Sequence, residues 1–245
     1  MNAPIPEFLR STQIFNEYMT PEAIALGERA KAMAPRLAER AFEAENAGMV
    51  PVETVREMAE AGFFKVLQPQ RWGGYEMDPR VFYRVQMALA EGCMATAWIY
   101  GVIGVHNWQL PLFPEQAQQD VWGSKPTTLI ASTYMPTGKA EAVEGGYRFS
   151  GRWGFSSGSD HCEWIFLGGL LPKKDGSGAL EHTTFLLPKS DFRVEKNWDV
   201  LGLRATGSCS SPMLAASPSA AGARRVPACS TTLPRAMSSP ARRMF

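Results

Sequence analysis

The sequence predicts an α+β fold in which an all-helical N-terminal domain precedes a small antiparallel β-barrel or sandwich. Apolar residues recur at helical spacing through the first half of the chain. Runs of β-branched and aromatic residues, separated by turn residues, then fill residues 127–198. We expect a helical domain over residues 1–125, an incomplete β-domain over 126–208 and a low-complexity tail over 209–245.

The first predicted helix begins at Thr20, which is a plausible N-cap because Pro21 follows at the first helical position. Pro35 lies within the apolar periodicity, and we expect it to kink or divide this helix. A second helix is expected from near Pro51 to Gly62, where the glycine is suited to a helix C-terminus.

The rest of the helical half contains one connection and two further helices. Residues 63–75 break the periodicity, and we expect an ordered connection. Asp78 and Pro79 match the cap and first residue of another helix. Residues 93–113 are almost continuously apolar or aromatic, which predicts a core helix that is buried on most sides.

The second half shows five or more short strands that are closely spaced along the chain. The strand-like runs are TTLIASTY, YRFSGRWGF, EWIFLGGLL, TTFLLP and FRVEKNW. Turn residues separate them at 136–138, 144–146 and 174–178. Strands at this spacing are typical of a small antiparallel barrel or sandwich, with the domain boundary near residues 124–127.

The end of the chain changes in composition. From Leu201 to Phe245 there is no Asp, Glu or Lys, and Ala, Ser, Pro and Arg predominate without any period. Such a segment cannot easily build a core and could be a disordered tail. A frame-shifted reading of a GC-rich gene would also produce this abrupt change, and we favour that interpretation.

The composition excludes several classes of function. Lys and Arg number 25 against 24 Asp and Glu, so the net charge of +1 gives no footprint for nucleic acid or an anionic membrane. The N-terminus lacks the pattern of a secretory signal, no stretch approaches a membrane span, and a cytoplasmic protein is expected. No metal site is expected, because the candidate ligands stand apart at Cys93, Cys162, Cys209, Cys229, His106, His161 and His182.

Three local sequences, in this order, resemble the acyl-CoA dehydrogenase superfamily. They are LQPQRWGG at 67–74, SGRWGFSSGSDHCEWIFLGG at 150–169 and LGLRATGS at 201–208. Within that superfamily, CMATAW at 93–98, GVHNW at 104–108, the strand end at 132–136 and FSSG at 155–158 resemble oxygenase components of two-component aromatic hydroxylases. The resemblance covers residues 20–208. The sequence resembles enzymes that hydroxylate a steroid-derived phenol more than it resembles those that hydroxylate 4-hydroxyphenylacetate.

The resemblance implies ortho-hydroxylation of a small phenolic substrate with reduced FMN or FAD and dioxygen. It also implies a separate flavin reductase as partner and a homotetramer. The family's C-terminal helical bundle is not recognisable in this sequence, so we expect a truncated product. Two alternatives stay open, namely an FAD-dependent acyl-CoA dehydrogenase and an inactive fragment.

The resemblance also implies roles for individual residues. Ser157 would hydrogen-bond near flavin N5, and Phe155 would pack against the isoalloxazine ring and exclude water. His106 would bond the phenol oxygen, with Trp98 as an aromatic wall nearby. The implied catalytic residues are His106 and Ser157, the implied cofactor-binding residues are Ser132, Tyr134, Phe155, Ser157 and Gly158, and the implied substrate-binding residues are Trp98 and His106.

Each of these residues also has a purely structural interpretation. A lone histidine in an apolar helix is more often a satisfied core residue, and Trp98 in a buried helix could simply fill the core. Residues 156–158 could be a turn at a strand end. The glycine pairs at 73–74 and 168–169 lack the spacing of a nucleotide-binding fingerprint, so we expect turns or bulges there.

Overall fold

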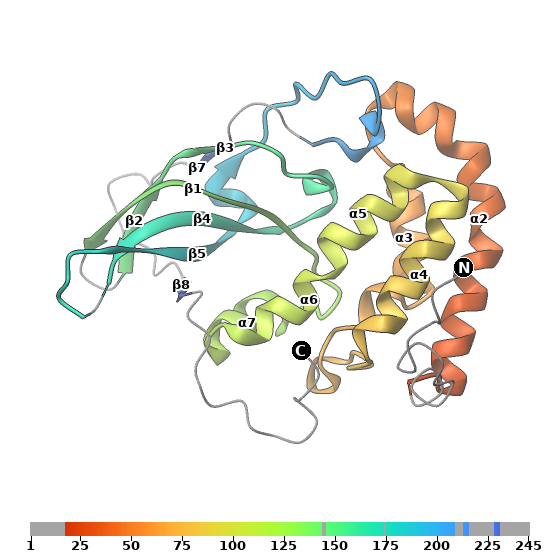
Figure 1. The fold of residues 1–245 in the computed structure, drawn as a ribbon, viewed down its shortest axis with the longest axis horizontal. Helices are drawn as coiled ribbons and strands as arrows, with labels where there is room; N and C mark the ends of the chain where they lie inside the picture. The colour runs from red at the N-terminus through yellow and green to blue at the C-terminus, as the bar shows by residue number, and fades with distance from the viewer. Residues whose placement is uncertain (1–17, 144–145, 174, 209–212, 216–227, 231–245) are drawn as a thin grey trace, which may run out of the picture.

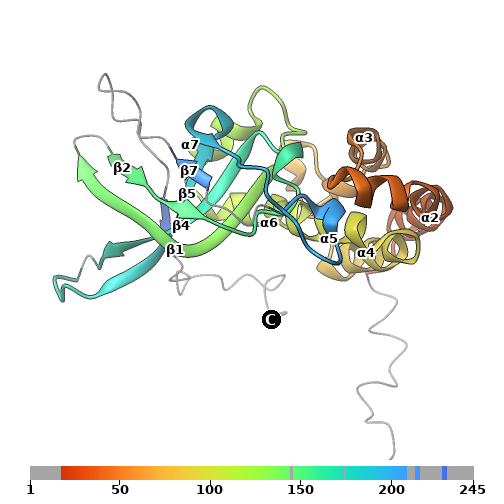
Figure 2. The ribbon, with the colours of Figure 1, turned by 90° about the horizontal axis from the view of Figure 1, so that it is seen from above.

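The computed structural model describes residues 18–143, 146–173, 175–208, 213–215 and 228–230. Helices form one end of the molecule and strands the other (Figures 1 and 2). The helices are α2 (Pro21–Ala47), α3 (Val52–Glu60), α4 (Pro79–Gly92), α5 (Met94–Gly104), α6 (His106–Gln109) and α7 (Glu115–Trp122), with 3₁₀ turns η2 (Phe63–Lys65), η3 (Gln70–Trp72) and η4 (Leu110–Leu112).

Helix α2 begins as the sequence predicts. Thr20 Oγ1 accepts a hydrogen bond from the backbone N–H of Ala23 at 3.2 Å, and Pro21 occupies the first turn. The helix continues through Pro35, so the alternative in which this proline divides it is wrong. A buried apolar face that includes Leu26 and Leu37 continues on both sides of Pro35, and its packing offsets the hydrogen bond that proline cannot make.

The predicted ends of the next helices are also confirmed. Gly62 follows α3 in the left-handed conformation, with φ of +85°. The carboxylate of Asp78 accepts the backbone N–H of Arg80 at 2.8 Å and caps α4. The connection between these helices is ordered by backbone hydrogen bonds, such as the 2.8 Å bond from Met77 N–H to the carbonyl of Val66.

The single core helix expected over residues 93–113 is wrong. The segment is divided into α5, α6 and η4, and Pro111 lies in the last of these. The inner face of α5 is buried as expected, but Trp98 on its outer face is 47% exposed. The glycines at 101 and 104 and the proline at 111 weaken helix continuity, which gives a physical reason for the division.

The strands form two sheets, and the change from helix to strand falls between Trp122 and Ile130. One sheet has the order β2-β1-β4-β5-β8 and the other β3-β7-β6. The elements are β1 (Ile130–Val143), β2 (Gly146–Ser150), β3 (Arg152–Trp153), β4 (Trp164–Pro172), β5 (Leu180–Pro188), β6 (Phe192–Arg193), β7 (Met213–Ala215) and β8 (Ala228–Ser230), with 3₁₀ turns η5 (Ser159–His161), η6 (Lys189–Asp191) and η7 (Arg204–Thr206).

The larger sheet is mixed, which corrects the expectation of a purely antiparallel β-domain. Strands β1 and β4 run parallel, whereas β1 with β2 and β4 with β5 are antiparallel pairs. Strands β2 and β3 and the turn η5 lie between β1 and β4 in the chain and return it to the starting end of the sheet. Parallel neighbours require such a long connection, which a count of strand-like runs does not reveal.

A wide bulge interrupts the pairing of β1 with β4, where the sequence predicts a turn at residues 136–138. Thr133 lies opposite Leu167, but the next pair is Gly138 opposite Gly169, so β1 carries extra residues and continues as one strand. The bulge crosses directly over Gly168, where a Cβ atom would lie 2.3 Å from the carbonyl oxygen of Tyr134. The second glycine pair therefore lies at a bulge, as expected.

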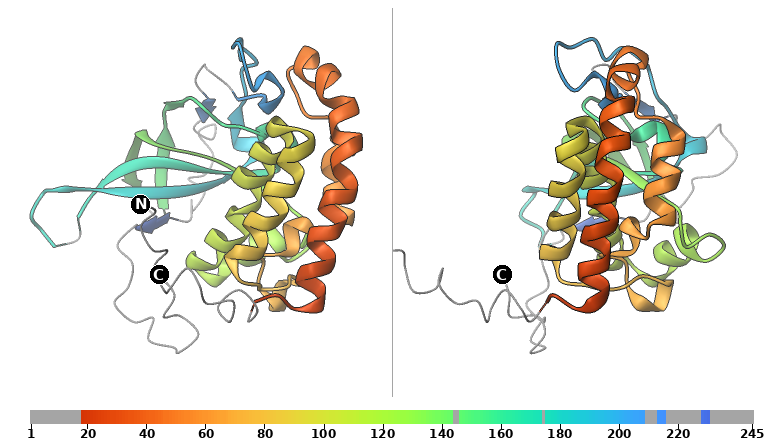
Figure 3. Two further views of the ribbon diagram at one scale, coloured as in Figure 1. Left: turned by 45° about the vertical axis from the view of Figure 1, so that its right-hand side comes forward. Right: turned by 90° about the vertical axis from the view of Figure 1, so that its right-hand side faces the viewer.

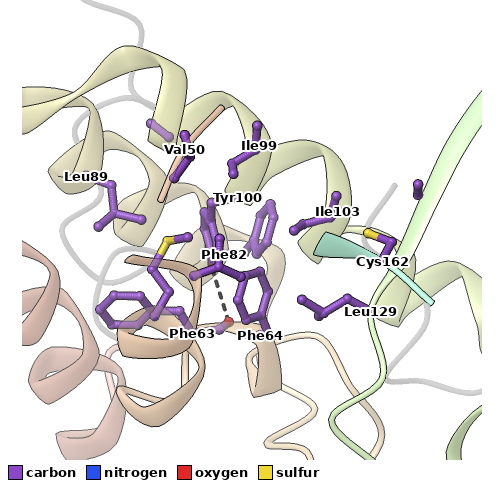
Figure 4. Packing of buried hydrophobic residues seen from close by; sticks show 14 of the residues in the cluster. Val50, Phe63, Phe64, Phe82, Leu89, Ile99, Tyr100, Ile103, Leu129 and Cys162 are labelled. Atoms are coloured by element: carbon purple, nitrogen blue, oxygen red, sulfur yellow. Dashed lines mark hydrogen bonds between the residues drawn. The ribbon is translucent and has the colours of Figure 1, made fainter. Parts of the chain in front are cut away.

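Apolar burial joins the helices to the sheet. Tyr100 of α5 lies at the centre of the cluster in Figure 4, with its ring 4.6 Å from that of Phe82 and 5.7 Å from that of Phe64. Its hydroxyl donates to the carbonyl of Phe63 at 3.3 Å, and burial raises the pKa of Tyr100 well above its usual value. The same cluster continues into the strands through Leu167, so helices and sheet share one core. Figure 3 shows the ribbon of the helices and strands from two further directions.

Most of the predicted tail lies outside the described residues, apart from β7 and β8. Among the residues that are described, no helix has both the length and the apolarity to cross a membrane. In the same part of the chain, no three His, Cys, Asp or Glu side chains gather in a way that could hold a metal ion.

Replacing Gly168 with alanine should destabilise the protein, because the new Cβ would meet a backbone oxygen that cannot move aside without opening the bulge. We expect a loss of at least about 2 kcal/mol in the free energy of unfolding, measured by urea denaturation. Gly202→Ala is the matched control, since nothing lies within 4 Å of its added Cβ. Equal stabilities of the two variants would contradict the close approach at Gly168.

Candidate functional site

A cavity of about 610 Å³ lies between α5, the bulge of β1, the segment after β3 and the chain that leads into η7. Its volume is within the range of roughly 300–1,000 Å³ that is usual for small-molecule sites. The residues that line it are Trp98, Val102, Ser132, Thr133, Tyr134, Met135, Gly154, Phe155, Ser157, Trp198, Val200, Gly202, Leu203, Thr206 and Ser208.

The lining is aromatic and hydroxylated. In the part of the chain that the structure describes, no lining residue is Asp, Glu, Lys, Arg or His. Four aromatic rings and five hydroxyl-bearing side chains other than tyrosine border the cavity. A surface of this kind binds a largely apolar ring system and orients it with a few hydrogen bonds.

A second hollow, of about 450 Å³, lies between α2 and α3 and has a different character. Its lining includes arginine and glutamate side chains that pair with each other, such as Arg36 with Glu57 at 3.1 Å and Arg56 with Glu60 at 3.6 Å. These pairs already satisfy the charges at its walls. The uncharged cavity is therefore the better candidate for a ligand site.

The structure joins two of the predicted site residues by a hydrogen bond. Trp98 Nε1 donates to Ser157 Oγ at 3.1 Å, although the two residues come from a helix and from a loop of the β-domain. Because an indole N–H can only donate, Ser157 must act as the acceptor in this bond. The hydroxyl hydrogen of Ser157 and its second lone pair remain for a ligand. Trp98 thus orients Ser157 and also forms part of the wall.

Phe155 lies on the cavity wall in an unusual backbone conformation. Its φ is +62°, which is uncommon for a residue with a side chain, and 65% of its surface is exposed. Its ring meets that of Trp198 edge to face, at 6.1 Å between centroids and 84° between planes. The strained backbone therefore presents the phenyl ring at the cavity instead of turning it into the core.

Ser132 and Tyr134 also line the cavity; Ser132 lies in the regular part of β1, opposite Phe166, and Tyr134 lies in the bulge that follows Thr133, so neither is at the end of the strand. The hydroxyl of Tyr134 donates to Gln109 Oε1, and burial raises the pKa of this hydroxyl to about 12. Tyr134 therefore stays protonated at neutral pH. Its carbonyl lies 2.8 Å from His182 Nε2, which helps to hold the bulge in place.

Gly158 does not border the cavity, although it follows Ser157 directly. Its backbone has a φ of +72°, and its N–H donates to the carbonyl of Thr206 at 2.9 Å. A Cβ at this position would lie 3.1 Å from Ile103 of α5. Gly158 shapes the turn that presents Ser157, which does not match the direct cofactor contact predicted for it.

His106 is not part of the cavity wall. It is buried, at 1% exposure, and its Nδ1 lies 2.6 Å from the carbonyl of Ile130, so that Nδ1–H donates to this strand. Its ring packs edge to face against Phe166 and Tyr134. Burial lowers the pKa of His106 to about 4, partly opposed by the bond to Ile130. The predicted phenol contact does not match this position, since the start of α6 turns the ring toward β1.

The sequence reasoning missed the wall that the chain before and within η7 supplies. Trp198, Leu203 and Thr206 all line the cavity. The carbonyl of Leu203 accepts hydrogen bonds from Trp198 Nε1 at 3.1 Å and from Thr206 Oγ1 at 2.8 Å, which holds this wall together. The stretch LGLRATGS at 201–208 could have pointed to this wall, because it resembles a segment of the family. The resemblance, however, assigned no role to any residue of this stretch.

Comparison with known protein families matches residues 20–127 to the acyl-CoA dehydrogenase N-terminal domain. This range covers the helices α2 to α7 and ends just before β1. The helical half of the fold and its order along the chain are those expected from the sequence resemblance.

Sequence relatives extend the likeness into the β-domain. The chain is 45% identical over 181 residues to the flavin-dependent monooxygenase oxygenase subunit HsaA of Rhodococcus jostii (strain RHA1), which covers 74% of this chain and 47% of that protein. It is 32% identical over 189 residues to the FADH(2)-dependent resorcinol hydroxylase oxygenase component of Rhizobium sp. (strain MTP-10005), covering 77% and 46%. The chain thus spans about half the length of these curated relatives.

A solved structure agrees with the sequence relatives. The crystal structure of 3-HSA hydroxylase from Rhodococcus sp. RHA1 superposes with a TM-score of 0.76 at 40% identity, covering 84% of this chain and 51% of that one. These relatives favour the hydroxylase interpretation over the acyl-CoA dehydrogenase alternative. The chain therefore belongs to the acyl-CoA dehydrogenase superfamily, and these curated relatives, which it matches over about half their length, are named as oxygenase subunits or components.

Proposed function

We propose that this protein is the oxygenase component of a two-component monooxygenase that ortho-hydroxylates a phenol. The observation that carries the proposal is the uncharged cavity in which Trp98 holds the hydroxyl of Ser157 between aromatic walls. A relative that is 45% identical is a flavin-dependent oxygenase subunit, which supports the same function. A separate flavin reductase and a homotetrameric assembly belong to this proposal.

The cavity fits the ring system of a reduced flavin. Trp98, Phe155 and Trp198 offer aromatic faces and edges for a flat tricyclic group, and the hydroxyls of Ser132 and Ser157 can hydrogen-bond its polar edge. The uncharged lining suits the ring, which is itself largely apolar. We favour FAD over FMN, since the resorcinol hydroxylase relative is named as FADH(2)-dependent.

When bound, the reduced flavin would supply two electrons and activate dioxygen, so that one oxygen atom enters the phenol ring as a hydroxyl and the other leaves as water. The role of Ser157 follows from its bond to Trp98. Its free lone pair can hold a proton at flavin N5, while its own O–H remains a donor. Phe155 and Trp198, whose rings meet edge to face, would border the bound ring and limit the access of water to it, which would reduce the loss of hydrogen peroxide.

His106 acts, in this proposal, behind the cavity and not in it. Its ring lies against Tyr134 and its Nδ1–H donates to the start of β1, so it supports the strand start that carries Ser132 and the bulge that carries Tyr134. A histidine whose pKa is about 4 stays neutral at physiological pH. We therefore assign His106 a positioning role.

The lining also indicates the class of phenol. Among the described residues no cationic side chain borders the cavity, so a carboxylated substrate would meet no oppositely charged partner from this part of the chain. An uncharged phenol, such as one fused to further apolar rings, fits better. This favours the steroid-phenol type of substrate over 4-hydroxyphenylacetate.

The experiment that tests the function uses the 245-residue chain. It would be titrated anaerobically with reduced FAD and reduced FMN, and the bound form mixed with ¹⁸O₂ and one of three phenols. The phenols are 5,6,7,8-tetrahydro-2-naphthol, 4-ethylphenol and 4-hydroxyphenylacetate. We expect a catechol that contains one ¹⁸O atom, formed from the two neutral phenols at least about tenfold faster than from the carboxylate.

Other outcomes of this experiment have distinct meanings. Binding of oxidised FAD that an acyl-CoA bleaches, without any catechol, would replace the proposal with the dehydrogenase alternative. A chain that binds neither flavin would be the inactive fragment, and family membership would stand without the activity. Faster hydroxylation of 4-hydroxyphenylacetate would overturn only the substrate class.

Replacing Ser157 with alanine should raise the share of consumed dioxygen that ends as hydrogen peroxide by about tenfold, because one hydrogen bond at flavin N5 is lost. Trp98→Phe keeps a ring in the wall but removes the donor to Ser157, so it should show part of the same effect. Peroxide and catechol would be measured together. Trp108→Phe is the control, since this tryptophan is also exposed but lies outside the cavity lining. An unchanged ratio in Ser157→Ala would remove Ser157 from the proposal.

His106 should make stability depend on pH. Its pKa is about 4 in the folded protein against an ordinary 6.5, so the unfolded chain takes up the proton first as the pH falls. The stabilisation from neutral His106 is complete above pH 6.5 and is lost between about pH 6.5 and 4. We expect the free energy of unfolding to drop between pH 7 and 4.5 by roughly 2 kcal/mol more than in His106→Asn. Urea denaturation at each pH measures this drop, and parallel curves would contradict the buried neutral form.

A further inference from the structure

The cavity wall around η7 is fastened to a residue that lies far from it in the sequence. The carboxylate of Glu45, near the end of α2, accepts the backbone N–H of Arg204 at 2.8 Å and that of Ala205 at 3.4 Å. These two amides begin the η7 turn and have no carbonyl partner within it. Glu45 is partly buried, so these bonds are shielded from water.

Further contacts hold the same junction between α2 and η7. The backbone N–H of Val50 donates to the carbonyl of Ala205 at 2.8 Å. Gly207 has a φ of +58°, and a Cβ there would lie 3.3 Å from both the carbonyl of Gly48 and a carboxylate oxygen of Asp160. Three turns that are distant in the sequence therefore meet with little free space.

One hydrogen bond connects the junction to the residue that follows Ser157. The carbonyl of Thr206, the last residue of η7, accepts the N–H of Gly158 at 2.9 Å. Gly158 follows Ser157, whose hydroxyl is held by Trp98. The position of η7 thus sets where the loop that carries Ser157 lies.

A second set of contacts connects the junction between α2 and η7 to the aromatic wall of the cavity. Leu203 directly precedes Arg204 and has a φ of +56°, a conformation that residues with a Cβ adopt only when their surroundings impose it. Its carbonyl accepts the indole N–H of Trp198 at 3.1 Å, and Trp198 meets the ring of Phe155. A shift at Arg204 would release Leu203 and, with it, both aromatic rings.

We propose that Glu45 is a positioning residue of the flavin site, which acts on Ser157 and on the Phe155–Trp198 wall through η7. Glu45 does not line the cavity. Its influence on flavin and dioxygen rests on the proposed function, whereas its control of the loop geometry does not. A carboxylate suits this task because its two oxygens accept two neighbouring amides at once.

Two substitutions separate the parts of this role. Glu45→Ala removes both acceptors, whereas Glu45→Gln keeps one oxygen and should retain part of the anchoring. Glu43→Gln is the matched control, because Glu43 lies on the same helix, is exposed and makes no hydrogen bond to η7 in the part of the chain described. Glu45→Gln also keeps the test open if Glu45→Ala does not fold.

Amide hydrogen exchange of the full chain without flavin is the first readout. Glu45→Ala should speed exchange at least about tenfold at Gly158 and across residues 198–208, Glu45→Gln should do so less, and α4 and the β4–β5 pair should keep wild-type rates. Unchanged rates at Gly158 would overturn the proposal. A uniform rise in all segments would do so too, because Glu45 would then contribute only general stability.

The second readout concerns the bound state. In Glu45→Ala the Kd for reduced flavin should rise and the peroxide share should approach that of Ser157→Ala, with partial rescue in Glu45→Gln. Normal affinity and coupling in a variant with loosened loops would overturn the influence on the site. If the wild-type chain binds no flavin, the proposed function fails, while the exchange experiment still decides whether Glu45 positions the cavity loops.

Discussion

The burial of α5 between the other helices and the sheet is the constraint on which the rest of the structure depends. Ile99, Tyr100 and Ile103 face a core that α5 shares with both halves of the fold. With that face buried, Trp98 must point away from the core, toward the loop that carries Ser157. One helix thus fixes how the helical and strand domains meet, and it supplies the first wall of the cavity between them.

Local departures from regular structure shape the other walls. The bulge of β1 places Tyr134 at the cavity next to Ser132, and it is possible because Gly168 leaves room for the crossing backbone. Phe155 and Leu203 adopt positive φ values, which cost of order 1–3 kcal/mol each in ordinary residues. Burial elsewhere in the fold must offset this cost in free energy. The strained conformations place aromatic rings and hydroxyl groups around the same cavity.

The site achieves its polarity without net charge. Tyr134 is protonated at neutral pH, as an ordinary tyrosine is, and burial raises its pKa further, to about 12; His106 stays neutral because burial lowers its pKa to about 4. The hydroxyl of Ser157 is oriented by an indole N–H and not by an ion. The described lining thus offers hydroxyl groups without charge, and the carboxylate of Glu45 holds η7 from outside the cavity.

The sequence by itself determined the features that depend on neighbouring residues. The cap at Thr20, the glycine end at Gly62 and the order of helices before strands follow from local propensity and spacing, and the motifs around Trp98 and Ser157 located two cavity residues. The tertiary structure alone decided the parallel pairing of β1 with β4, the position of His106 behind the wall and the link from Glu45 to η7. Those features join residues that are about 25 to 160 positions apart in the sequence. The free energy that selects such contacts comes from burying a core shared by distant segments, and a local sequence pattern does not show which distant segments will pack together.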